Sequence, residues 1–335
     1  MRVLVTGAAG LIGGELCARL VARGHAVTAL VHRETRVLGN DRRVVAGVTL
    51  LAGDVTRPGL GLAQVPDVDL VVHCAAVTAF DAVAEVYRAV NVDGTAHVVG
   101  LGLPMIQVST AYVCGTRDGV VREDETGTDF VNGYEASKAA AEAIVRQSGV
   151  RFAIARPSVV VGDSGSGAIR SFDNIYMIFR LIAERRVRTL PGAAGASLDL
   201  VPIDHVCGGI VAMVEDFAAV EGLTLHLVGR EPTPLTRIGA AIAAVPGLGA
   251  PVFVDPADFA PERLPPVERR YHAAAASLYV NYLLRGPVFD VANAARRVAA
   301  CPATDRAWLD RLIGFCVAEG FVTARRDRES PRISA

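Results

Sequence analysis

The sequence predicts a doubly wound α/β fold, in which helices cover both faces of a parallel sheet, with a smaller and mostly helical lobe toward the C-terminus. Three observations lead to this prediction. From Arg2 to about Val161, short apolar runs alternate with segments of helical period, a glycine-rich turn joins the first run to the first helix, and the alternation breaks after Gly162. Continuous apolar runs joined by helices are typical of strands buried on both faces of a parallel sheet.

Six short runs are the expected strands of the first half. They are residues 3–5, 26–31, 48–52, 70–72, 105–108 and 152–155. The helix after the first run carries Ile12, Leu16 and Leu20 at i+4 spacing, and Gly24 is a suitable left-handed cap at its end.

The second half begins with a Gly/Ser loop over residues 162–167 and continues with mixed elements. In order, we expect a helix around residues 172–179, a strand at 223–228, a helix at 235–245, a Pro-rich stretch at 251–266, and helical segments at 273–284, 291–300 and 307–318. We therefore assign residues 1–162 to the sheet domain, with later strands contributed by 198–245, and residues 163–324 to an interleaved lobe. Residues 325–335 are expected to be a disordered tail.

Composition excludes several classes of protein. The 335 residues carry 34 basic and 35 acidic side chains and are 51% hydrophobic, which disfavours disorder and a nucleic-acid partner. The six cysteines and seven histidines show no metal-ligand spacing, so no metal site is expected. We also expect a cytoplasmic protein without a membrane span, because no leader precedes Arg2 and no apolar run reaches the ~18 residues that a span needs.

The glycine-rich turn over residues 6–13 predicts a dinucleotide site. Glycines at 7, 10 and 13 permit a tight turn and close approach of the backbone to a pyrophosphate, and the turn lies between a strand and a helix as this motif requires. A purely structural turn is the alternative. The cofactor contacts predicted here are Gly7, Ala9, Gly10, Leu11, Ile12 and Gly13.

The end of the second strand favours NADP(H) over NAD(H). An acidic side chain that would bind the ribose 2′-OH is missing directly after Val31, whereas His32, Arg33 and Arg36 offer positive charge to a 2′-phosphate, with Glu34 opposing them. Ordinary exposed arginines in an arginine-rich chain are the alternative reading. After the third strand, Asp54 and Val55 are placed to touch the adenine, although Asp54 could equally be a turn residue.

Lys138 is the only lysine among the 34 basic residues, and it lies four positions after Tyr134. With seven tyrosines in 335 positions, chance gives this spacing a probability of about 2%. On a helix the two side chains share a face, and an ammonium beside a phenol stabilises the phenolate and makes proton transfer practical at neutral pH. The pair therefore predicts a catalytic site.

With Ser109 and Thr110 at the end of the fifth strand, the chain resembles the short-chain dehydrogenase/reductase superfamily in its extended form. The motifs of the resemblance, which covers about residues 2–300, are 6–13, 53–54, 73–76, 91–95, 109–110, 134–138 and 156–158. Those at 73–76, 108–113, 156–163 and 198–206 are most similar to the thioester-reductase and fatty-acyl-reductase (male-sterility) branch. The fold implied is a Rossmann-type sheet with a substrate-binding lobe.

The resemblance also implies roles for individual residues. Tyr134 would be the general acid, Lys138 its pKa partner and a ligand of the cofactor ribose, and Thr110 the hydroxyl that orients the carbonyl oxygen, unless Ser109 takes that role. Asn91 would support a water relay or make a structural helix contact, and His73 would lie beside the cofactor or be structural. The remaining cofactor contacts implied are Cys74, Ala75, Ala76, Pro157, Ser158, Val159 and Val160.

Substrate contacts are the least determined part of the prediction. The candidates are Thr78, Phe80, Tyr112, Phe172 and Tyr176. The Met/aromatic stripe that contains Phe172 and Tyr176 is usually core, and a pocket for a lipophilic group is the alternative. The arginines at 170, 180, 185 and 186 could instead receive a nucleotide sugar.

The function expected is an NADPH-dependent reductase of a ketone, an aldehyde or an activated acyl thioester in a lipophilic or secondary-metabolite substrate. The substrate would be a small molecule, free or bound to a carrier or CoA, and the enzyme a monomer or homodimer. Two alternatives stay open, an NAD-dependent nucleotide-sugar epimerase or dehydratase and a non-catalytic NADP-sensing protein.

Overall fold

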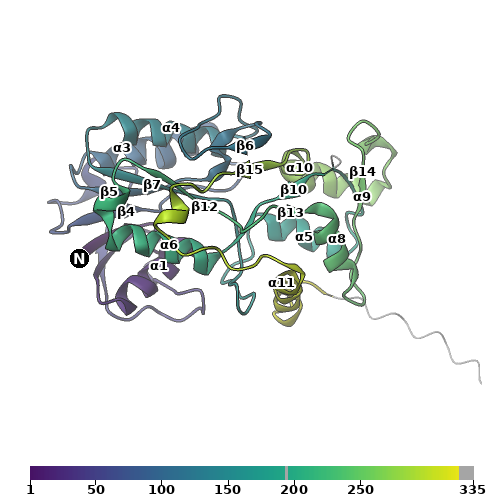
Figure 1. Ribbon diagram of the computed structural model, residues 1–335, viewed down its shortest axis with the longest axis horizontal. Coiled ribbons are helices and arrows are strands. Elements are labelled where there is room, and N and C mark those ends of the chain that lie inside the picture. Colours follow the sequence, from purple (N-terminus) through teal and green to yellow (C-terminus); the bar gives the residue numbers. More distant parts are fainter. Residues whose placement is uncertain (193–194, 324–335) are drawn as a thin grey trace, which may run out of the picture.

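A computed structural model describes residues 1–192 and 195–323, and its largest sheet confirms the predicted doubly wound fold (Figure 1). All seven strands of this sheet are parallel. In sheet order they are β12 (Thr224–Leu227), β7 (Phe152–Pro157), β5 (Met105–Val108), β4 (Leu70–His73), β1 (Arg2–Thr6), β2 (Ala26–Val31) and β3 (Val48–Ala52). Each predicted strand lies at its expected place along the chain.

Helices cover both faces of the sheet, with α1 and α6 on one face and α3 and α4 on the other (Figure 1). The helices of this part are α1 (Leu11–Ala22), α2 (Ala84–Tyr87), a π-helical turn (Arg88–Asp93), α3 (Gly94–Val99), α4 (Gly133–Gln147), α6 (Ile203–Glu215) and α7 (Phe217–Val220). Strand β1 explains the continuous apolar runs: Val3 and Val5 pack in the core beneath α1 and α6, and Leu4 in the core beneath α4. Successive side chains of a strand point to opposite faces, and helices cover both faces here, so all three side chains are fully buried.

The strand order reverses between β1 and β4. The chain builds β1, β2 and β3 outward in one direction, and then places β4, β5, β7 and β12 on the other side of β1. In open parallel sheets of this kind, ligands bind outside the carboxyl ends of the strands at the reversal. The residues that follow β1 and β4 are therefore positioned to form a binding cleft.

Much of the rest of the described chain forms a lobe at the other end of the molecule, and residues 293–296 return to β12 of the sheet (Figure 1). Its helices are α5 (Ile175–Ala183), α8 (Leu235–Ala243), α9 (Pro266–Tyr271), a π-helical turn (His272–Ala276), α10 (Ser277–Leu283) and α11 (Arg306–Ala318). Short strand pairs complete it and join it to the sheet domain: β8 (Val159–Val161) with β11 (Leu200–Pro202), β9 (Thr189–Pro191) with β14 (Val252–Val254), β10 (Ser197–Leu198) with β13 (Thr233–Pro234), and β6 (Gly119–Val121) with β15 (Pro287–Phe289). The lobe has a core of its own around the fully buried Trp308.

The helix predicted over residues 291–300 is wrong, because this segment forms only a 3-10 turn at Ala294–Arg296. The backbone N–H groups of Asn293 and Ala294 donate to the buried carboxylate of Glu123 at 2.5 and 3.1 Å, so a distant side chain takes the donors. The Pro-rich stretch 251–266 holds the short strand β14 and one 3-10 turn, Pro261–Arg263, and α9 begins at its last residue. The tail predicted for 325–335 lies outside the described residues.

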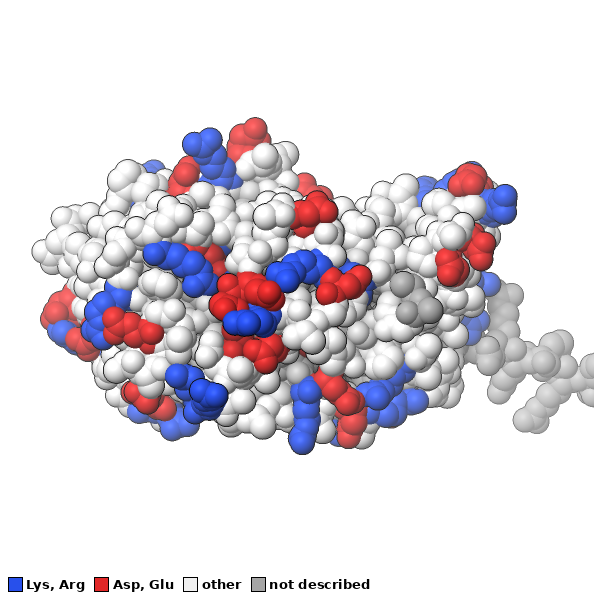
Figure 2. Space-filling model, turned by 45° about the horizontal axis from the view of Figure 1, so that its top comes forward, with Lys and Arg blue, Asp and Glu red and all other residues white. Residues whose placement is uncertain are grey.

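Charged side chains of both signs are interspersed over the face that Figure 2 shows, without a large area of one sign. Many form surface pairs such as Arg151 with Glu221 at 2.6 Å. Within residues 1–192 and 195–323, no helix has the length and apolar character needed to cross a membrane.

Candidate active site

A cleft of about 620 Å³ lies at the point where the strand order reverses. The glycine turn after β1, the ends of β4 and β5, the first turns of α4 and the segment around β8 all contribute to its walls. Of the predicted site residues, the lining includes Gly7, Ala9, Gly10, Leu11, Ile12, Gly13, Arg36, Cys74, Ala76, Thr78, Phe80, Ser109, Thr110, Tyr112, Tyr134, Lys138, Pro157, Ser158, Val159, Val160 and Tyr176. The cleft thus joins glycine turn, hydroxyls and Tyr/Lys pair in one cavity.

The glycine turn presents bare backbone to one end of the cleft. Gly7 has φ +67°, and a Cβ at this position would lie 2.6 Å from the backbone nitrogen of Ala75, so only glycine fits. Helix α1 begins at its N-cap Gly10 without a capping side chain and without an acidic residue in the first turn. Its free N–H groups and the positive end of its dipole therefore face the cleft, which fits a cofactor pyrophosphate.

Helix α4 carries the Tyr/Lys pair into the cleft beside the end of β5. Asn132 caps the helix, and its side-chain oxygen accepts from the backbone N–H of Glu135 at 2.9 Å. Tyr134 and Lys138 follow one helical turn apart, and the Lys138 ammonium donates to the carbonyl oxygen of Val108 at 2.7 Å. This bond fixes the ammonium next to Ser109 and Thr110, the two residues that follow β5.

Burial shifts the acid–base properties of this cluster. It lowers the pKa of Lys138 to about 8, although the negative charge of Glu142 acts in the opposite direction. It raises the pKa of the Tyr134 phenol above its usual range, while a hydrogen bond with Thr110 acts to lower it. At neutral pH, Tyr134 is therefore a protonated donor and Lys138 a cation.

The two hydroxyls after β5 differ in their surroundings. The Thr110 hydroxyl accepts from the backbone N–H of Tyr112 at 3.3 Å and faces Tyr134. The Ser109 hydroxyl is buried, and it acts with Arg156 to lower the pKa of the neighbouring Glu142 carboxyl. Thr110 therefore lies toward Tyr134, and Ser109 lies toward Glu142.

Glu142 lies one turn beyond Lys138 on the same face of α4, a continuation that sequence reasoning missed. Its two carboxylate oxygens accept from Nε and Nη2 of Arg156 at 2.8 and 2.7 Å, and both side chains are essentially fully buried. Arg156 also donates to the carbonyl oxygens of Glu123 and Glu125. The pair ties β7 to α4 behind the site.

Asn91 and His73 make structural contacts in this structure. The Asn91 side chain accepts from the backbone N–H of Val77 at 2.7 Å and donates to the Ser137 hydroxyl at 2.8 Å, so it joins the loop after β4 to α4. The His73 ring lies between the hydroxyls of Thr6 and Thr95, and burial, together with the Lys138 charge, lowers its pKa to about 3. The polar atoms of both side chains are thus hydrogen-bonded to other residues of the protein.

Three basic residues after β2 were predicted to favour NADP(H), and of these only Arg36 lines the cleft. The acidic Glu34 also lines the cleft and pairs with Arg36 at 3.2 Å. His32 lies 3.6 Å from Asp54, outside the lining. Arg33, Val55 and Ala75 are also absent from the lining. The loop that follows β2 therefore turns its second arginine, and not its first, toward the cleft.

Aromatic rings form the other end of the cleft. Phe80 is central, with its ring centroid 5.9 Å from that of Tyr134 and 5.3 Å from that of Tyr282, on which it stacks. Phe172 is absent from the lining and stacks instead on Phe321 at 4.2 Å. The substrate end of the cleft is thus largely apolar.

A buried ion pair next to Tyr134 was not predicted. The Arg285 guanidinium lies over the rings of Tyr112 and Tyr282, 5.1 and 4.8 Å from their centroids, and donates to Glu135 at 2.6 Å. Tyr282 donates to the same carboxylate oxygen at 2.7 Å. Arg285 and Glu135 are 150 residues apart, and one arginine among so many carries no sequence signal that would single it out.

Arg170 also lines the cleft, although the sequence did not predict it as a cofactor contact. Its guanidinium donates to the backbone carbonyl oxygens of Leu38 and Ala9 at 3.0 and 3.1 Å, and it forms no ion pair with any carboxylate of residues 1–192 and 195–323. It lies beside the glycine turn. In this part of the chain there is also no cluster of three or more side chains suited to hold a metal ion.

Residues 5–210 match the family described as "Male sterility protein", whose defining unit is an NAD-binding domain. The chain belongs to this family. It is an extended short-chain dehydrogenase/reductase of the thioester-reductase branch, and its family binds a nicotinamide cofactor. The match covers the glycine turn, both hydroxyls and the Tyr/Lys pair, and the family is one of oxidoreductases.

Relatives of this male sterility family member include reductase domains of large synthetases. A solved structure titled "The crystal structure of the terminal R domain from the myxalamid PKS-NRPS biosynthetic pathway" is 25% identical, with a TM-score of 0.82 over 97% of this chain and 92% of the other. The "Hybrid PKS-NRPS synthetase pvhA" of Talaromyces variabilis is 27% identical over 63% of this chain and 6% of its own length. The "3-beta-hydroxysteroid dehydrogenase" of Mycolicibacterium neoaurum is 27% identical over 64% of this chain and 61% of its own length.

The chain therefore spans only a small part of the curated synthetases that it matches. A solved UDP-galactose 4-epimerase is 22% identical with a TM-score of 0.66, over 96% of this chain and 99% of the other, and this likeness shows the fold alone.

Proposed function

We propose that the protein is an NADPH-dependent reductase that transfers hydride to the carbonyl carbon of an acyl thioester or aldehyde with a lipophilic chain. The observation that supports this most is the meeting of Thr110, Tyr134 and Lys138 at the end of β5, in the cleft that opens at the glycine turn. The relatives named for PKS-NRPS pathways support a thioester as substrate, free, CoA-bound or carrier-bound.

In this proposal, the bound cofactor supplies the hydride, and the chain supplies the donors that stabilise charge on the carbonyl oxygen. Thr110 orients that oxygen, and Tyr134, protonated because of its burial, donates the proton. The Lys138 ammonium, held by the Val108 carbonyl, stabilises the phenolate that remains. Asn91 acts by positioning α4, because it donates to the Ser137 hydroxyl, which in turn donates to the backbone carbonyl of Tyr134.

Two features of the cleft argue against a nucleotide sugar. Its substrate end is lined by aromatic rings such as Phe80 and Tyr282. The arginines that could have received a diphosphate do not converge, because Arg180 and Arg186 both pair with Glu184 on the surface. A lipophilic carbonyl substrate fits this lining better.

The proposal is tested by following NADPH oxidation with N-acetylcysteamine thioesters and aldehydes of increasing chain length. We expect each thioester to give an aldehyde and the released thiol N-acetylcysteamine, and each aldehyde to give an alcohol, with one NADPH oxidised per reduction. A protein that co-purifies with one equivalent of nicotinamide cofactor and interconverts nucleotide sugars without net NADPH oxidation would instead be an epimerase.

Cofactor binding should weaken as pH rises through about 8. Lys138 has a lowered pKa of about 8, so it is charged below that pH and loses its charge above it. Its neighbours do not titrate in this window, since burial raises the pKa of Cys74 to about 12 and that of His73 is about 3. Fluorescence titration should therefore give a Kd for NADPH that rises above pH 8, whereas Lys138→Met should show a weaker and nearly pH-independent Kd over pH 7 to 9. An equally steep rise in the variant would contradict this assignment.

Arg36 and Arg170 should affect the two cofactors differently. Arg36 follows β2, where a 2′-phosphate would lie, so Arg36→Met should weaken NADPH about tenfold or more and leave NADH unchanged, as expected for one charged hydrogen bond. Arg170 is bonded to Ala9 of the glycine turn, so Arg170→Met should weaken both cofactors. Calorimetric titration measures both, with Arg237→Met as control, because the half-buried Arg237 pairs with Glu231 and lies outside the cleft lining. An unchanged ratio of NADPH to NADH affinity in Arg36→Met would overturn the assignment of Arg36 to the 2′-phosphate, and unchanged binding of both cofactors in Arg170→Met would overturn the role of Arg170.

A further inference from the structure

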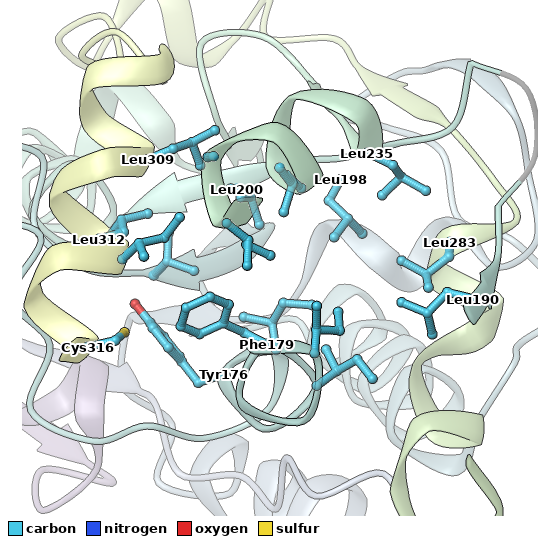
Figure 3. Close-up of a pocket in the computed structure, with 18 of the residues that line it drawn as sticks. Tyr176, Phe179, Leu190, Leu198, Leu200, Leu235, Leu283, Leu309, Leu312 and Cys316 are labelled. Carbon is cyan, nitrogen blue, oxygen red and sulfur yellow. The ribbon is translucent and has the colours of Figure 1, made fainter. Parts of the chain in front are cut away.

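The lobe contains a second, partly open cavity of about 100 Å³, which is lined by apolar side chains and lies beside the cleft (Figure 3). Helices α5, α8 and α11 and the short strands around them form its walls. Figure 3 shows Phe179 and Tyr176 on one side, Leu309 and Leu312 of α11 on another, and Leu235 opposite. The lining offers little for a polar ligand, because the Tyr176 hydroxyl already accepts from the backbone N–H of Gly162 at 2.9 Å.

The volume of this cavity is large for a packing defect. Protein cores have few voids larger than a water molecule, and an engineered apolar cavity of ~150 Å³ is large enough to bind benzene. A cavity of about 100 Å³ has room for an alkyl group somewhat smaller than a benzene ring. A group of about three or four carbons fits this volume.

The Tyr176 side chain lines both the cavity and the cleft, so it forms part of the wall that they share. Helix α5 runs from one to the other: Asn174, which precedes the helix, lines the cleft, and Phe179 and Ile182 further along line the cavity. Asn174 has φ +51° and ψ −115°, a strained conformation for a residue with a side chain, and such strain is often found at ligand sites.

We propose that this cavity receives the terminal alkyl group of the substrate chain, whose carbonyl lies between Thr110 and Tyr134. The inference rests on the proposed function and deepens it, because it names a substrate with an unbranched aliphatic chain that ends in the lobe. The chain passes Tyr176 and leaves the polar end of the substrate in the cleft. Burial of each methylene in the cavity then contributes to affinity.

Primary n-alkyl carboxamides test the cavity independently of turnover, because hydride transfer does not reduce them. Calorimetric titration into the enzyme saturated with NADP⁺ should give affinity that rises about fourfold for each methylene that enters the cavity, followed by a plateau when the cavity is full. Affinity that shows no such plateau, or no dependence on chain length, would overturn the inference.

Two variants should move this plateau in opposite directions. Ala241 of α8 is fully buried and lines the cavity but not the cleft. Ala241→Leu fills part of the cavity, so affinity should reach its plateau at a carboxamide chain about three carbons shorter. Ile238→Ala enlarges the same cavity and should extend the rise to longer chains. The matched control is Ala183→Leu, which makes the same change at a buried α5 residue of the same core outside the cavity lining. A plateau unmoved in both cavity variants would refute the assignment.

The two proposals can fail separately. A plateau that moves as expected, in an enzyme that reduces no thioester or aldehyde, supports the cavity assignment and overturns the proposed reaction. Reduction of thioesters with the same kcat/KM for acetyl and long-chain acyl groups, together with an unmoved plateau, supports the reaction and overturns the cavity assignment.

Discussion

Replacement of Tyr134 by phenylalanine is expected to lower kcat by about 10²- to 10⁴-fold, the usual contribution of one general acid. The ring would keep its place against Phe80, 5.9 Å away, so the change removes only the hydroxyl that faces Thr110. NADPH binding should be unchanged, because the Lys138 ammonium is held by the Val108 carbonyl and not by the phenol. Single-turnover kinetics and a cofactor titration measure the two effects separately.

Tyr279→Phe is the matched control for this experiment. Tyr279 also packs on Phe80, with ring centroids 5.5 Å apart, but it does not line the cleft. Its loss of a hydroxyl should leave kcat and KM unchanged. If Tyr134→Phe kept a kcat within about threefold of the parent, Tyr134 would not be the general acid of this site.

The largest loss of stability is expected for Arg156→Met. The change leaves the Glu142 carboxylate buried without its main partner, and frees the carbonyl oxygens of Glu123 and Glu125. Removal of one member of a buried ion pair costs about 3–5 kcal/mol in the free energy of unfolding. Urea denaturation should therefore show a lower midpoint with an unchanged slope.

Two further variants separate burial from charge in this network. Arg122→Met removes an exposed arginine paired with the exposed Asp124, and should change the free energy of unfolding by about 1 kcal/mol or less. The double variant Arg156→Met with Glu142→Leu removes both buried charges and should regain part of the lost stability. No regain would mean that Arg156 acts mainly through the carbonyl oxygens that it binds.

Local patterns in the sequence were sufficient for the features that depend on local spacing. The strands are continuous apolar runs, the glycine turn is a contiguous motif, and Tyr134 and Lys138 are one helical turn apart. Glu142 repeats the same spacing after Lys138, so it could have been found by the same argument.

Features that depend on distant contacts could not be predicted in this way. Arg170 reaches the glycine turn from 161 residues away, and its role depends on how a loop of the lobe folds back. The orientation of Arg36 rather than Arg33 toward the cleft depends on the path of an irregular loop after β2. The segment 291–300 has helical periodicity, but its N–H groups bind Glu123 of another element.

The buried pair of Arg285 with Glu135 has a consequence for engineering this enzyme. Glu135 follows Tyr134 directly, so the proposed general acid and the lobe are joined by one buried ion pair across 150 residues of chain. A chimera whose grafted lobe lacks an arginine at position 285 would leave Glu135 without its buried partner next to Tyr134. Exchange of specificity by domain grafting therefore requires that positions 135, 282 and 285 be transferred together as one unit.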